Sequence, residues 1–465
     1  MIKLHLSEIA LMVGGDLVGS DEEVFGSVET DSRLVRSGSL FFAKPGETTD
    51  GHNFVGSAKD LGAVGAVVEK FQPDVDLPQI LVTDSVAALG LLAAGALKLV
   101  RDRGDIKVIG ITGSNGKTST KNMLGAILRG FGNTVSPIDS FNNEVGAPIS
   151  ILKIDESTKY LVVEMGAAGL GSISYLAKMV KPDFGVVLKV GLAHVGVFGG
   201  IEVTAKIKSE LVQELDSSGT FIFNGDDAEV VKMSGLTSAK SVSFGTNLNA
   251  EYRFDNLDLS LDGTAADLHL PDGRLARVKL QILGEHQLMN AAAALAVADQ
   301  LGLDLEASLQ ALSALPLAER WRMQLTNRKD GVSIINDAYN ASPDSMKAAL
   351  QTLAHLGKQG RRTIAVLGEM AELGEFSKEE HDQLGRLVVR YNIDQLVVVG
   401  SAAKLIHLGA MQEGSWDGES IFFESSSDAL EHIRGMLEAG DIVLVKSSKS
   451  ANLRHLGDDL LEVLN

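Results

Sequence analysis

The sequence predicts an α/β fold of three domains, and three observations support this. The chain has 465 residues, which at roughly 150 residues per domain suggests about three domains. Apolar segments of strand length alternate with segments of helical periodicity, a pattern typical of parallel sheets covered by helices on both faces. The chain holds 49 glycines and only 9 prolines, which suits many tight strand-to-helix turns.

Residues 1–84 form the predicted small N-terminal α/β domain. The run Thr83–Gly104 is expected to be a helix and linker that leads into the next domain. Its most apolar part, Ala87–Val100, is too short to span a bilayer, so it predicts a buried helix. Short apolar strands are expected at Leu40–Ala43, Ala63–Glu69 and Gln79–Val82.

Residues 85–315 form the predicted central domain, a parallel sheet that carries an antiparallel flap. A buried strand, Lys107–Thr112, is followed by a Gly-rich turn and the helical run Lys117–Arg129. Residues 246–283 alternate apolar and polar side chains around Pro271-Asp272-Gly273, which predicts the antiparallel flap. Further strands are expected at Tyr160–Met165, Phe184–Val190 and Thr220–Asn224, and further helices at Val203–Leu215 and His286–Leu301.

Residues 316–465 form the predicted C-terminal domain. Strands alternate with helices here without interruption, which predicts a doubly wound, Rossmann-like sheet. The strands are expected at Val332–Ile335, Thr363–Leu367, Gln395–Val399 and Ile442–Val445, and the helices at Pro343–Leu356, Lys378–Tyr391 and Asp428–Leu437.

Composition excludes several classes of function. The formal net charge of -19 disfavours binding to nucleic acid, although an anionic small substrate can still enter a locally positive site. The chain has no cysteine, which excludes disulfides, thiolate zinc sites and thiol nucleophiles. The start of the chain, Met1–Val13, lacks the basic end and apolar core of a signal peptide. We therefore expect a cytoplasmic protein that is not an integral membrane protein.

The turn after the strand Lys107–Thr112 predicts a phosphate site of the P-loop type. Its glycines let consecutive backbone N–H groups point at phosphate oxygens, and the helix that follows adds its positive N-terminal end. Lys117 can reach the outer phosphates, and the Thr118 hydroxyl is placed to ligate Mg²⁺. The standard pattern requires glycine where the chain has Ile111, so a chance Gly-rich turn is the alternative.

Other polar residues follow strands of the same predicted sheet. Glu164 ends an apolar strand at the carboxyl edge, where α/β sheets bind ligands, but a strand-end acid is often only solvated. His194 follows the next strand, and histidine is an uncommon partner for Mg²⁺, which prefers oxygen ligands. From the residues alone, Lys206 and Lys208 belong to a solvated helix face.

The segment Thr112-Gly113-Ser114-Asn115-Gly116-Lys117-Thr118 resembles the ATP loop of the Mur ligase family, whose cell-wall enzymes add amino acids to a UDP-linked muropeptide. The resemblance runs over nearly the whole chain. Asp31-Ser32-Arg33, Phe41-Phe42-Ala43 and Asp50-Gly51-His52 resemble the family's UDP-substrate domain. Asn142-Asn143-Glu144-Val145-Gly146 is similar to its muropeptide loop, and Gly284-Glu285-His286 with Asn290 to its adenine-contacting helix start. Asn336–Pro343 and Gly368–Gly374 resemble the dipeptide-adding branch, and the D-N-P-R motif of the diaminopimelate-adding branch is absent.

The resemblance implies an ADP-forming ligase that activates a carboxylate as an acyl phosphate and joins D-alanyl-D-alanine to UDP-N-acetylmuramoyl-tripeptide, acting as a monomer. It implies two Mg²⁺ ions and bicarbonate or CO₂ that carbamylates Lys208, with Lys117, Lys208 and His194 as catalytic residues. The implied ATP-binding residues are Thr112, Gly113, Ser114, Asn115, Gly116, Lys117, Thr118, Ser119, Asn290, Arg320 and Asp337. The implied substrate-binding residues are Ser32, Arg33, His52, Asn142, Asn143, Tyr339 and Asn340, and the implied metal ligands are Thr118, Glu164, His194 and carbamylated Lys208.

Two departures and two alternatives accompany this resemblance. Ala167-Ala168-Gly169 stands where such enzymes usually carry an Asn-His pair, and Ala318-Glu319-Arg320 replaces the common Pro-Gly-Arg. One alternative is another ligase of the family, such as a third-residue adder or a folate-polyglutamate ligase. The other is a switch or transport ATPase, which would hydrolyse ATP without an amine acceptor.

Overall fold

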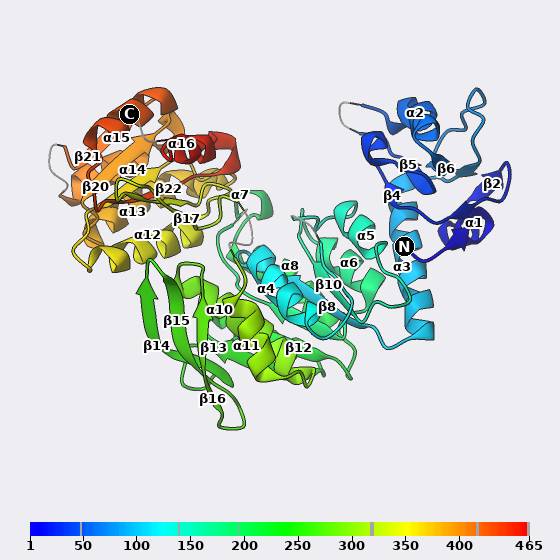
Figure 1. Ribbon diagram of the computed structural model, residues 1–465, viewed down its shortest axis with the longest axis horizontal. Helices are drawn as coiled ribbons and strands as arrows, with labels where there is room; N and C mark the ends of the chain where they lie inside the picture. The colour runs from blue at the N-terminus through cyan, green and yellow to red at the C-terminus, as the bar shows by residue number, and fades with distance from the viewer. Residues whose placement is uncertain (47–48, 138–139, 194, 317–319, 415–417, 463–465) are drawn as a thin grey trace.

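The computed structural model describes residues 1–46, 49–137, 140–193, 195–316, 320–414 and 418–462. Three main sheets follow one another along the chain, with the N-terminal and C-terminal sheets at opposite ends and the central sheet between them (Figure 1). Helices cover the central and C-terminal sheets, so the predicted α/β class is confirmed. No helix among the described residues is long and apolar enough to cross a membrane.

The N-terminal sheet has five strands in the order β2-β7-β6-β5-β4. Every residue of β5 is buried, as expected for a parallel strand covered on both faces. The three predicted strands are confirmed as β5 (Ser39–Ala43), β6 (Ala63–Val68) and β7 (Gln79–Leu81). The other elements are β1 (Leu4–His5), α1 (Leu6–Val13), β2 (Asp16–Val18), β3 (Glu23–Val24), β4 (Val28–Glu29) and α2 (Val55–Asp60).

A long helix, α3 (Ser85–Arg103), joins the N-terminal sheet to the central one. It begins after Asp84, whose side chain accepts hydrogen bonds from the backbone N–H groups of Val86 and Ala87. Its buried face carries leucine and alanine side chains that pack against α1, α5 (Gly146–Ile151) and α6 (Ser172–Val180). The buried helix predicted from Thr83 to Gly104 is therefore confirmed.

The central sheet has nine strands in the order β16-β15-β14-β13-β12-β11-β8-β10-β9. The strands from β9 to β14 pair in parallel, and β14, β15 and β16 are antiparallel. The predicted flap is thus the antiparallel end of this sheet, because β14 pairs with β13, a strand the sequence analysis missed. The strands are β8 (Lys107–Thr112), β9 (Thr134–Val135), β10 (Tyr160–Glu164), β11 (Phe184–Val187), β12 (Thr220–Asn224), β13 (Lys240–Gly245), β14 (Tyr252–Ser260), β15 (Gly263–His269) and β16 (Leu275–Leu280).

Two helices of the central part pack closely against each other, α4 and α10. The small side chains of α10, an almost continuous run of buried alanines, allow this close approach. The predicted helices at 117–129, 203–215 and 286–301 are confirmed, whereas α5, α6, α7, α9 and α11 were not predicted. The helices of this part are α4 (Lys117–Arg129), α5, α6, α7 (Val195–Phe198), α8 (Ile201–Gln213), α9 (Ala228–Lys232), α10 (Glu285–Gln300) and α11 (Leu305–Ser313).

The C-terminal sheet has six strands in the order β17-β18-β22-β19-β20-β21. All neighbours pair in parallel except β17 and β18, so the predicted doubly wound pattern is confirmed with one antiparallel edge strand. The strands are β17 (Gln324–Asn327), β18 (Ser333–Asn336), β19 (Thr363–Leu367), β20 (Gln395–Val399), β21 (Ser420–Phe423) and β22 (Ile442–Lys446). The helices are α12 (Pro343–Gly357), α13 (Ser377–Arg390), α14 (Lys404–Glu413), α15 (Ser426–Met436) and α16 (Leu453–Asp459).

The C-terminal part touches the central part at two places. Helix α12 contacts α10 and β14, and α7 contacts the short 3-10 helix Gly374–Phe376. In Figure 1, α7 reaches from the central sheet toward the C-terminal one. These contacts bring the carboxyl edge of the central sheet close to loops of the C-terminal sheet.

Candidate functional site

The predicted phosphate loop connects β8 to α4 at the carboxyl edge of the central sheet. Gly116 has φ +85°, and a Cβ atom there would meet the Asn290 Oδ1 atom at 2.3 Å, so only glycine fits. The Lys117 ammonium folds back over the loop and donates to the Gly113 carbonyl oxygen at 2.7 Å. Burial lowers the pKa of Lys117, and the charge of Glu164 opposes that shift. A cation held here can exchange its carbonyl contact for a phosphate oxygen.

Glu164 lies at the end of β10, which pairs with β8. Its Oε1 atom accepts hydrogen bonds from Asn142 Nδ2 at 2.7 Å and from Thr118 Oγ1 at 3.4 Å. Its Oε2 atom is buried and has no hydrogen-bond partner among the described residues. An unpaired buried carboxylate oxygen is costly, and a bound cation would satisfy it.

These oxygens fit the preference of Mg²⁺. The ion takes one or two protein carboxylates, waters and substrate phosphates, and Glu164 with the Thr118 hydroxyl supplies such a partial set next to the phosphate loop. The described residues contain no group of three or more His, Asp and Glu side chains that could hold a metal alone. The remaining ligands would therefore come from a nucleotide, from water or from residues of other types.

Lys208 projects from α8 and is buried. Loss of hydration lowers the pKa of its ammonium to about 7, the charge of Lys117 adds to this effect, and Glu210 opposes it. Its Nζ atom lies 6.0 Å from the centre of the Phe198 ring on α7. Lys206 is exposed, as expected for a residue on the solvated face of this helix. His194 lies outside the described residues.

A cavity of about 330 Å³ joins the central and C-terminal parts. On the central side it is lined by Lys117, Thr118 and Glu164, among others. On the C-terminal side, its lining residues include Arg322, Asp337, Tyr339, Asn340 and Lys446. A neighbouring cavity of about 660 Å³ shares Asn115, Gly116, His286 and Asn290 with it. Together the two cavities can hold an elongated ligand with phosphates at one end.

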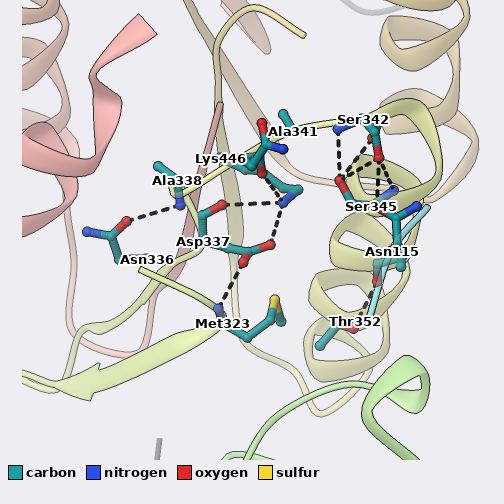
Figure 2. Close-up of polar contacts among 12 residues, drawn as sticks. Asn115, Met323, Asn336, Asp337, Ala338, Ala341, Ser342, Ser345, Thr352 and Lys446 are labelled. Carbon is teal, nitrogen blue, oxygen red and sulfur yellow. Dashed lines mark hydrogen bonds and ion pairs between the residues drawn. The ribbon is translucent and has the colours of Figure 1, made fainter. Parts of the chain in front are cut away.

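Asp337 and Lys446 form a buried pair on the C-terminal wall of this site (Figure 2). Lys446 Nζ donates to Asp337 Oδ2 at 2.6 Å and to the Asn340 carbonyl oxygen at 3.1 Å. The Met323 backbone N–H donates to Asp337 Oδ1 at 2.9 Å. Every polar atom of the pair thus has a partner, and the loop after β18 is held in one place.

A direct hydrogen bond links the two walls, in addition to the ion pair between Lys189 Nζ and Asp344 Oδ1 at 2.7 Å. The Ser342 hydroxyl, at the start of α12, donates to Asn115 Oδ1 at 3.1 Å (Figure 2). The Asn115 Nδ2 atom is buried without a partner among the described residues. Asn115 and Glu164 both line the 330 Å³ cavity, so each wall residue of this pair has one buried polar atom without a partner among the described residues.

The structure does not place Arg320, the arginine expected at the ATP phosphates, among the residues that line this cavity. Its guanidinium donates to Asp458 Oδ2 at 2.7 Å and its side chain is 64% exposed. Arg322 lines the cavity instead, with its guanidinium 4.2 Å from the centre of the Tyr339 ring. Arg322 was not considered in the sequence analysis. Trp321 adopts φ +63° and Met323 adopts φ +49°, so the backbone turns sharply on both sides of Arg322.

Within the phosphate loop, Ser114, Asn115, Gly116, Lys117, Thr118 and Ser119 line the cavity. Thr112 does not line it, because its hydroxyl donates to the Met165 carbonyl oxygen at 2.9 Å and is fully buried. Asn290 lines both cavities, and its Oδ1 atom accepts a hydrogen bond from the Thr120 hydroxyl at 3.3 Å. His286, which the family resemblance places at the adenine-contacting helix start, lines both cavities, and burial lowers its pKa to about 4.

The residues expected at the UDP-substrate end divide into two groups. Asn142 and Asn143 line a third cavity, of about 670 Å³, with Asp84, the start of α3 and Ala167-Ala168. His52 instead is buried, and its Nε2 atom accepts hydrogen bonds from the backbone N–H groups of Glu69 and Lys70. Its other ring nitrogen contacts Asp50 Oδ1 at 2.6 Å, so His52 holds its loop and does not offer a free nitrogen to a substrate.

Ser32 and Arg33 lie in a short 3-10 helix. The Arg33 guanidinium is paired with Asp31 and its side chain is 86% exposed. A guanidinium on an exposed surface can leave such a pair at little cost, because exposed ion pairs contribute only about 0–1 kcal/mol. Neither Ser32 nor Arg33 is among the lining residues of the three cavities described above.

The fold and the site define a class of protein. A Gly-Lys-Thr turn at the carboxyl edge of a parallel sheet, a buried carboxylate beside it and a second α/β sheet across the cavity are typical of enzymes that use a nucleoside triphosphate.

Comparison with known proteins identifies the family. Residues 111–298 match the family model described as Mur ligase middle domain, residues 321–449 the Mur ligase, glutamate ligase domain, and residues 25–96 the Mur ligase family, catalytic domain. This chain belongs to the Mur ligase family.

Similar full-length proteins carry more specific names. The UDP-N-acetylmuramoyl-tripeptide–D-alanyl-D-alanine ligase of Mycobacterium tuberculosis H37Rv is 41% identical, over 99% of this chain and 98% of that protein. The ligase of the same name from Bacillus subtilis is 34% identical, over 99% of both. Crystal structure I of MurF from Acinetobacter baumannii has a TM-score of 0.90 at 31% identity, over 99% of both chains. MurF from Thermotoga maritima in complex with ADP has a TM-score of 0.83 at 28% identity, over 94% of this chain and 97% of that one.

Proposed function

We propose that this chain joins D-alanyl-D-alanine to UDP-N-acetylmuramoyl-tripeptide with ATP, releasing ADP and phosphate, in the synthesis of peptidoglycan precursors. The observation that carries the proposal is a full-length match, at 41% identity, to a ligase named for this reaction. The cavity between the phosphate loop and Arg322 supports it, because it lies where ATP could contact both the central and the C-terminal sheets. A cytoplasmic, monomeric enzyme is part of the proposal.

The reaction needs carboxylate activation, because forming a peptide bond from a free carboxylate in water is uphill. The terminal carboxylate of the tripeptide attacks the γ-phosphorus of ATP, and ADP leaves. The amine of the dipeptide then attacks the acyl carbon, loses a proton, and inorganic phosphate leaves. Both steps place negative charge near the phosphate loop, so Lys117 and Arg322 contribute chiefly by charge stabilisation and positioning.

Mg²⁺ would be held by Thr118 and Glu164, with His194 and Lys208 as the further ligands that the family resemblance implies. The unpaired Glu164 Oε2 atom is the observation that supports a cation at this place. When bound, the metal neutralises charge on the phosphates and polarises the phosphorus–oxygen bond. Asn142 holds the other carboxylate oxygen through its amide and fixes the orientation of Glu164.

Lys208 becomes an oxygen ligand if it carries a carbamate. The free amine attacks CO₂, a carbon–nitrogen bond forms, and one proton is released. Burial makes this reaction easier, because a lysine whose pKa is about 7 is substantially neutral at physiological pH. Replacement by alanine should remove most activity, and added short carboxylic acids should restore part of it. A fully active Lys208→Ala variant would show that the carbamate has no role.

The other ligand assignments follow the cavities. Asn290 and His286 lie where the larger cavity meets the phosphate loop, which suits an adenine ring, and Asp337 suits the ribose across it. We assign the UDP-muropeptide to residues 1–84 together with Asn142 and Asn143, ATP to residues 85–315, and the dipeptide to residues 316–465. Ser32 and Arg33 can bind the UDP end from the exposed surface of the first unit.

One experiment tests the function. Phosphate release is measured with ATP and UDP-N-acetylmuramoyl-tripeptide, with and without D-alanyl-D-alanine. We expect steady release only with all three substrates. Steady ATP hydrolysis at the same rate with and without the dipeptide would favour a switch or transport ATPase. Turnover with a UDP-muramoyl-dipeptide and a single amino acid would favour a third-residue adder.

A further inference from the structure

A fourth cavity, of about 260 Å³, lies next to the 330 Å³ cavity at the phosphate loop, and no ligand group has been assigned to it. The two cavities share Tyr339, Asn340 and Ser342, so a ligand in one lies beside a ligand in the other. Its volume is below the roughly 300–1,000 Å³ typical of pockets for drug-sized ligands, which suits a small occupant.

Loops after three adjacent parallel strands build this cavity. They follow β18, β22 and β19, which are neighbours in the C-terminal sheet. The Ala371 backbone N–H donates to the Ser448 hydroxyl at 2.7 Å, and the Ser448 N–H donates to the Glu369 carbonyl oxygen at 2.8 Å. Such converging loops at the carboxyl edge are where open α/β sheets bind ligands.

The lining matches a small zwitterion. Among the described residues, it has one cationic side chain, Lys449, and one anionic side chain, Glu372. The Lys449 ammonium lies 5.9 Å from the centre of the Tyr339 ring. Glu372 adopts φ +62°, a backbone conformation that non-glycine residues rarely take and that clusters at ligand sites. The lining also includes methyl-sized side chains at Ala193, Ala341 and Ala371, the apolar side chain of Leu373, and three serines.

We propose that this cavity binds the acceptor dipeptide, with its terminal carboxylate at Lys449, its amine at Glu372 and its methyl groups against the alanines. This inference rests on the proposed function. The opposite charges of Lys449 and Glu372 set the direction of the dipeptide, and the alanines leave little room for larger side chains.

This orientation directs the amine toward the reacting carboxylate. The Glu372 carbonyl oxygen accepts a hydrogen bond from the Gly196 N–H of α7 at 3.1 Å. Two residues further along α7, the Phe198 ring lies under the buried Lys208. Glu372 is therefore attached to the catalytic edge of the central sheet. As the carbon–nitrogen bond forms and the bond to phosphate breaks, the Glu372 carboxylate takes the proton that the amine loses.

The first test compares two acceptors, D-alanyl-D-alanine and its C-terminal amide. We expect wild-type enzyme to prefer the free acid, because a charged hydrogen bond contributes roughly 10- to 100-fold in binding. Lys449→Met should raise the KM for the free acid by that factor, leave the KM for ATP and tripeptide unchanged, and abolish the preference over the amide. A variant that keeps the wild-type preference would overturn the assignment.

Lys404→Met is the matched control. Lys404 also lies over an aromatic ring, 5.2 Å from the centre of Phe422, and begins helix α14 of the C-terminal part, but it does not line the cavity. It should leave the KM of all three substrates unchanged. Glu372→Gln should lower kcat most at low pH and regain activity as pH rises and more of the acceptor amine is free. A uniform loss at every pH would contradict the proton-accepting role.

A partial reaction separates this inference from the proposed function. Wild-type enzyme, ATP and tripeptide are incubated with hydroxylamine and without dipeptide, so that an acyl phosphate is trapped as a hydroxamate. No trapping by wild-type enzyme would refute the proposed function itself. Normal trapping by Lys449→Met and Glu372→Gln, with normal KM for the dipeptide, would refute only the acceptor cavity.

Discussion

The two walls of the 330 Å³ cavity at the phosphate loop differ in how their buried charges are paired. On the C-terminal wall, Lys446 and Asp337 satisfy each other and also bond to the Asn340 carbonyl and the Met323 N–H. On the central wall, one Glu164 oxygen has no partner among the described residues. Lys208, which is not a lining residue but whose pKa is affected by the charge of the lining residue Lys117, is buried enough to lower its pKa to about 7.

This difference indicates which wall has all its buried charges paired when no ligand is bound. A fully paired buried charge fixes a loop in one conformation, whereas an unpaired one costs stability until a ligand satisfies it. The C-terminal wall is thus a preformed support, and the central wall is the place where phosphates and metal complete the structure. Substitutions in the C-terminal wall should therefore lower the stability of the protein, whereas substitutions in the central wall should lower its activity.

Lys446→Met should cause the largest loss of stability. It leaves the Asp337 carboxylate, only 14% exposed, without its cationic partner, and breaking one side of a buried pair costs about 3–5 kcal/mol. Both tryptophans of the chain lie within residues 316–465, so tryptophan fluorescence during urea unfolding reports on this part. The matched double variant with Asp337→Leu should recover part of the loss. Unchanged stability of Lys446→Met would show that the pair does not support this wall.

Glu164→Gln should have the opposite effect, a loss of activity without a loss of stability. The amide keeps the shape of the side chain but removes the charge that a cation needs, so kcat should fall by roughly 10²–10³-fold. The free energy of unfolding should stay the same or rise, because an unpaired buried charge has been removed. ADP release with all three substrates measures the first effect and thermal unfolding the second. If Glu164→Gln retains normal ADP release, the metal assignment fails.

The strands and helices were largely predictable because their signal is local. Lys107–Thr112 and Lys117–Arg129 show strand and helix patterns in the sequence itself, and the structure has the same bounds. Strand β13 was missed, because its role as the link to the antiparallel strands depends on pairing with residues 252–253, which a local pattern does not reveal.

The part of the site that one loop and its neighbouring strand form could be predicted from the sequence. The parts where segments distant in sequence meet were harder to predict. The phosphate loop and Glu164 follow strands of one sheet, so topology alone places them together. Which arginine lines the cavity depends on two left-handed residues, Trp321 and Met323, and on Asp458, which lies far away in sequence. Likewise, the loop interactions of His52 depend on the backbone of Glu69 and Lys70, which its own motif does not include.

Lys208→Met should stabilise the protein while inactivating it. Burial lowers the pKa of Lys208 from 10.5 to about 7, so between these pH values the unfolded chain binds a proton that the folded chain does not. The free energy of unfolding of the wild-type protein should therefore rise with pH across that window. The variant removes this dependence and should gain on the order of 1–3 kcal/mol at pH 7.

Circular dichroism during thermal unfolding in CO₂-free buffer, from pH 7 to pH 10, checks this. Lys206→Met is the matched control, because Lys206 lies on the exposed face of the same helix and should change nothing. A Lys208→Met variant that is less stable than wild type at pH 7 would contradict the argument from burial.

The smallest expected effect distinguishes the two arginines beside Trp321. Arg322 lines the cavity over the Tyr339 ring and can contact phosphate oxygens, so Arg322→Ala should lower kcat/KM for ATP by about 10-fold or more. Arg320 forms an exposed pair with Asp458, and such pairs contribute about 0–1 kcal/mol, so Arg320→Ala should stay within about 2-fold of wild type. Initial rates at varied ATP measure both. The reverse order of effects would mean that the two segments rearrange when ATP binds, and that Arg320 replaces Arg322 in the closed site.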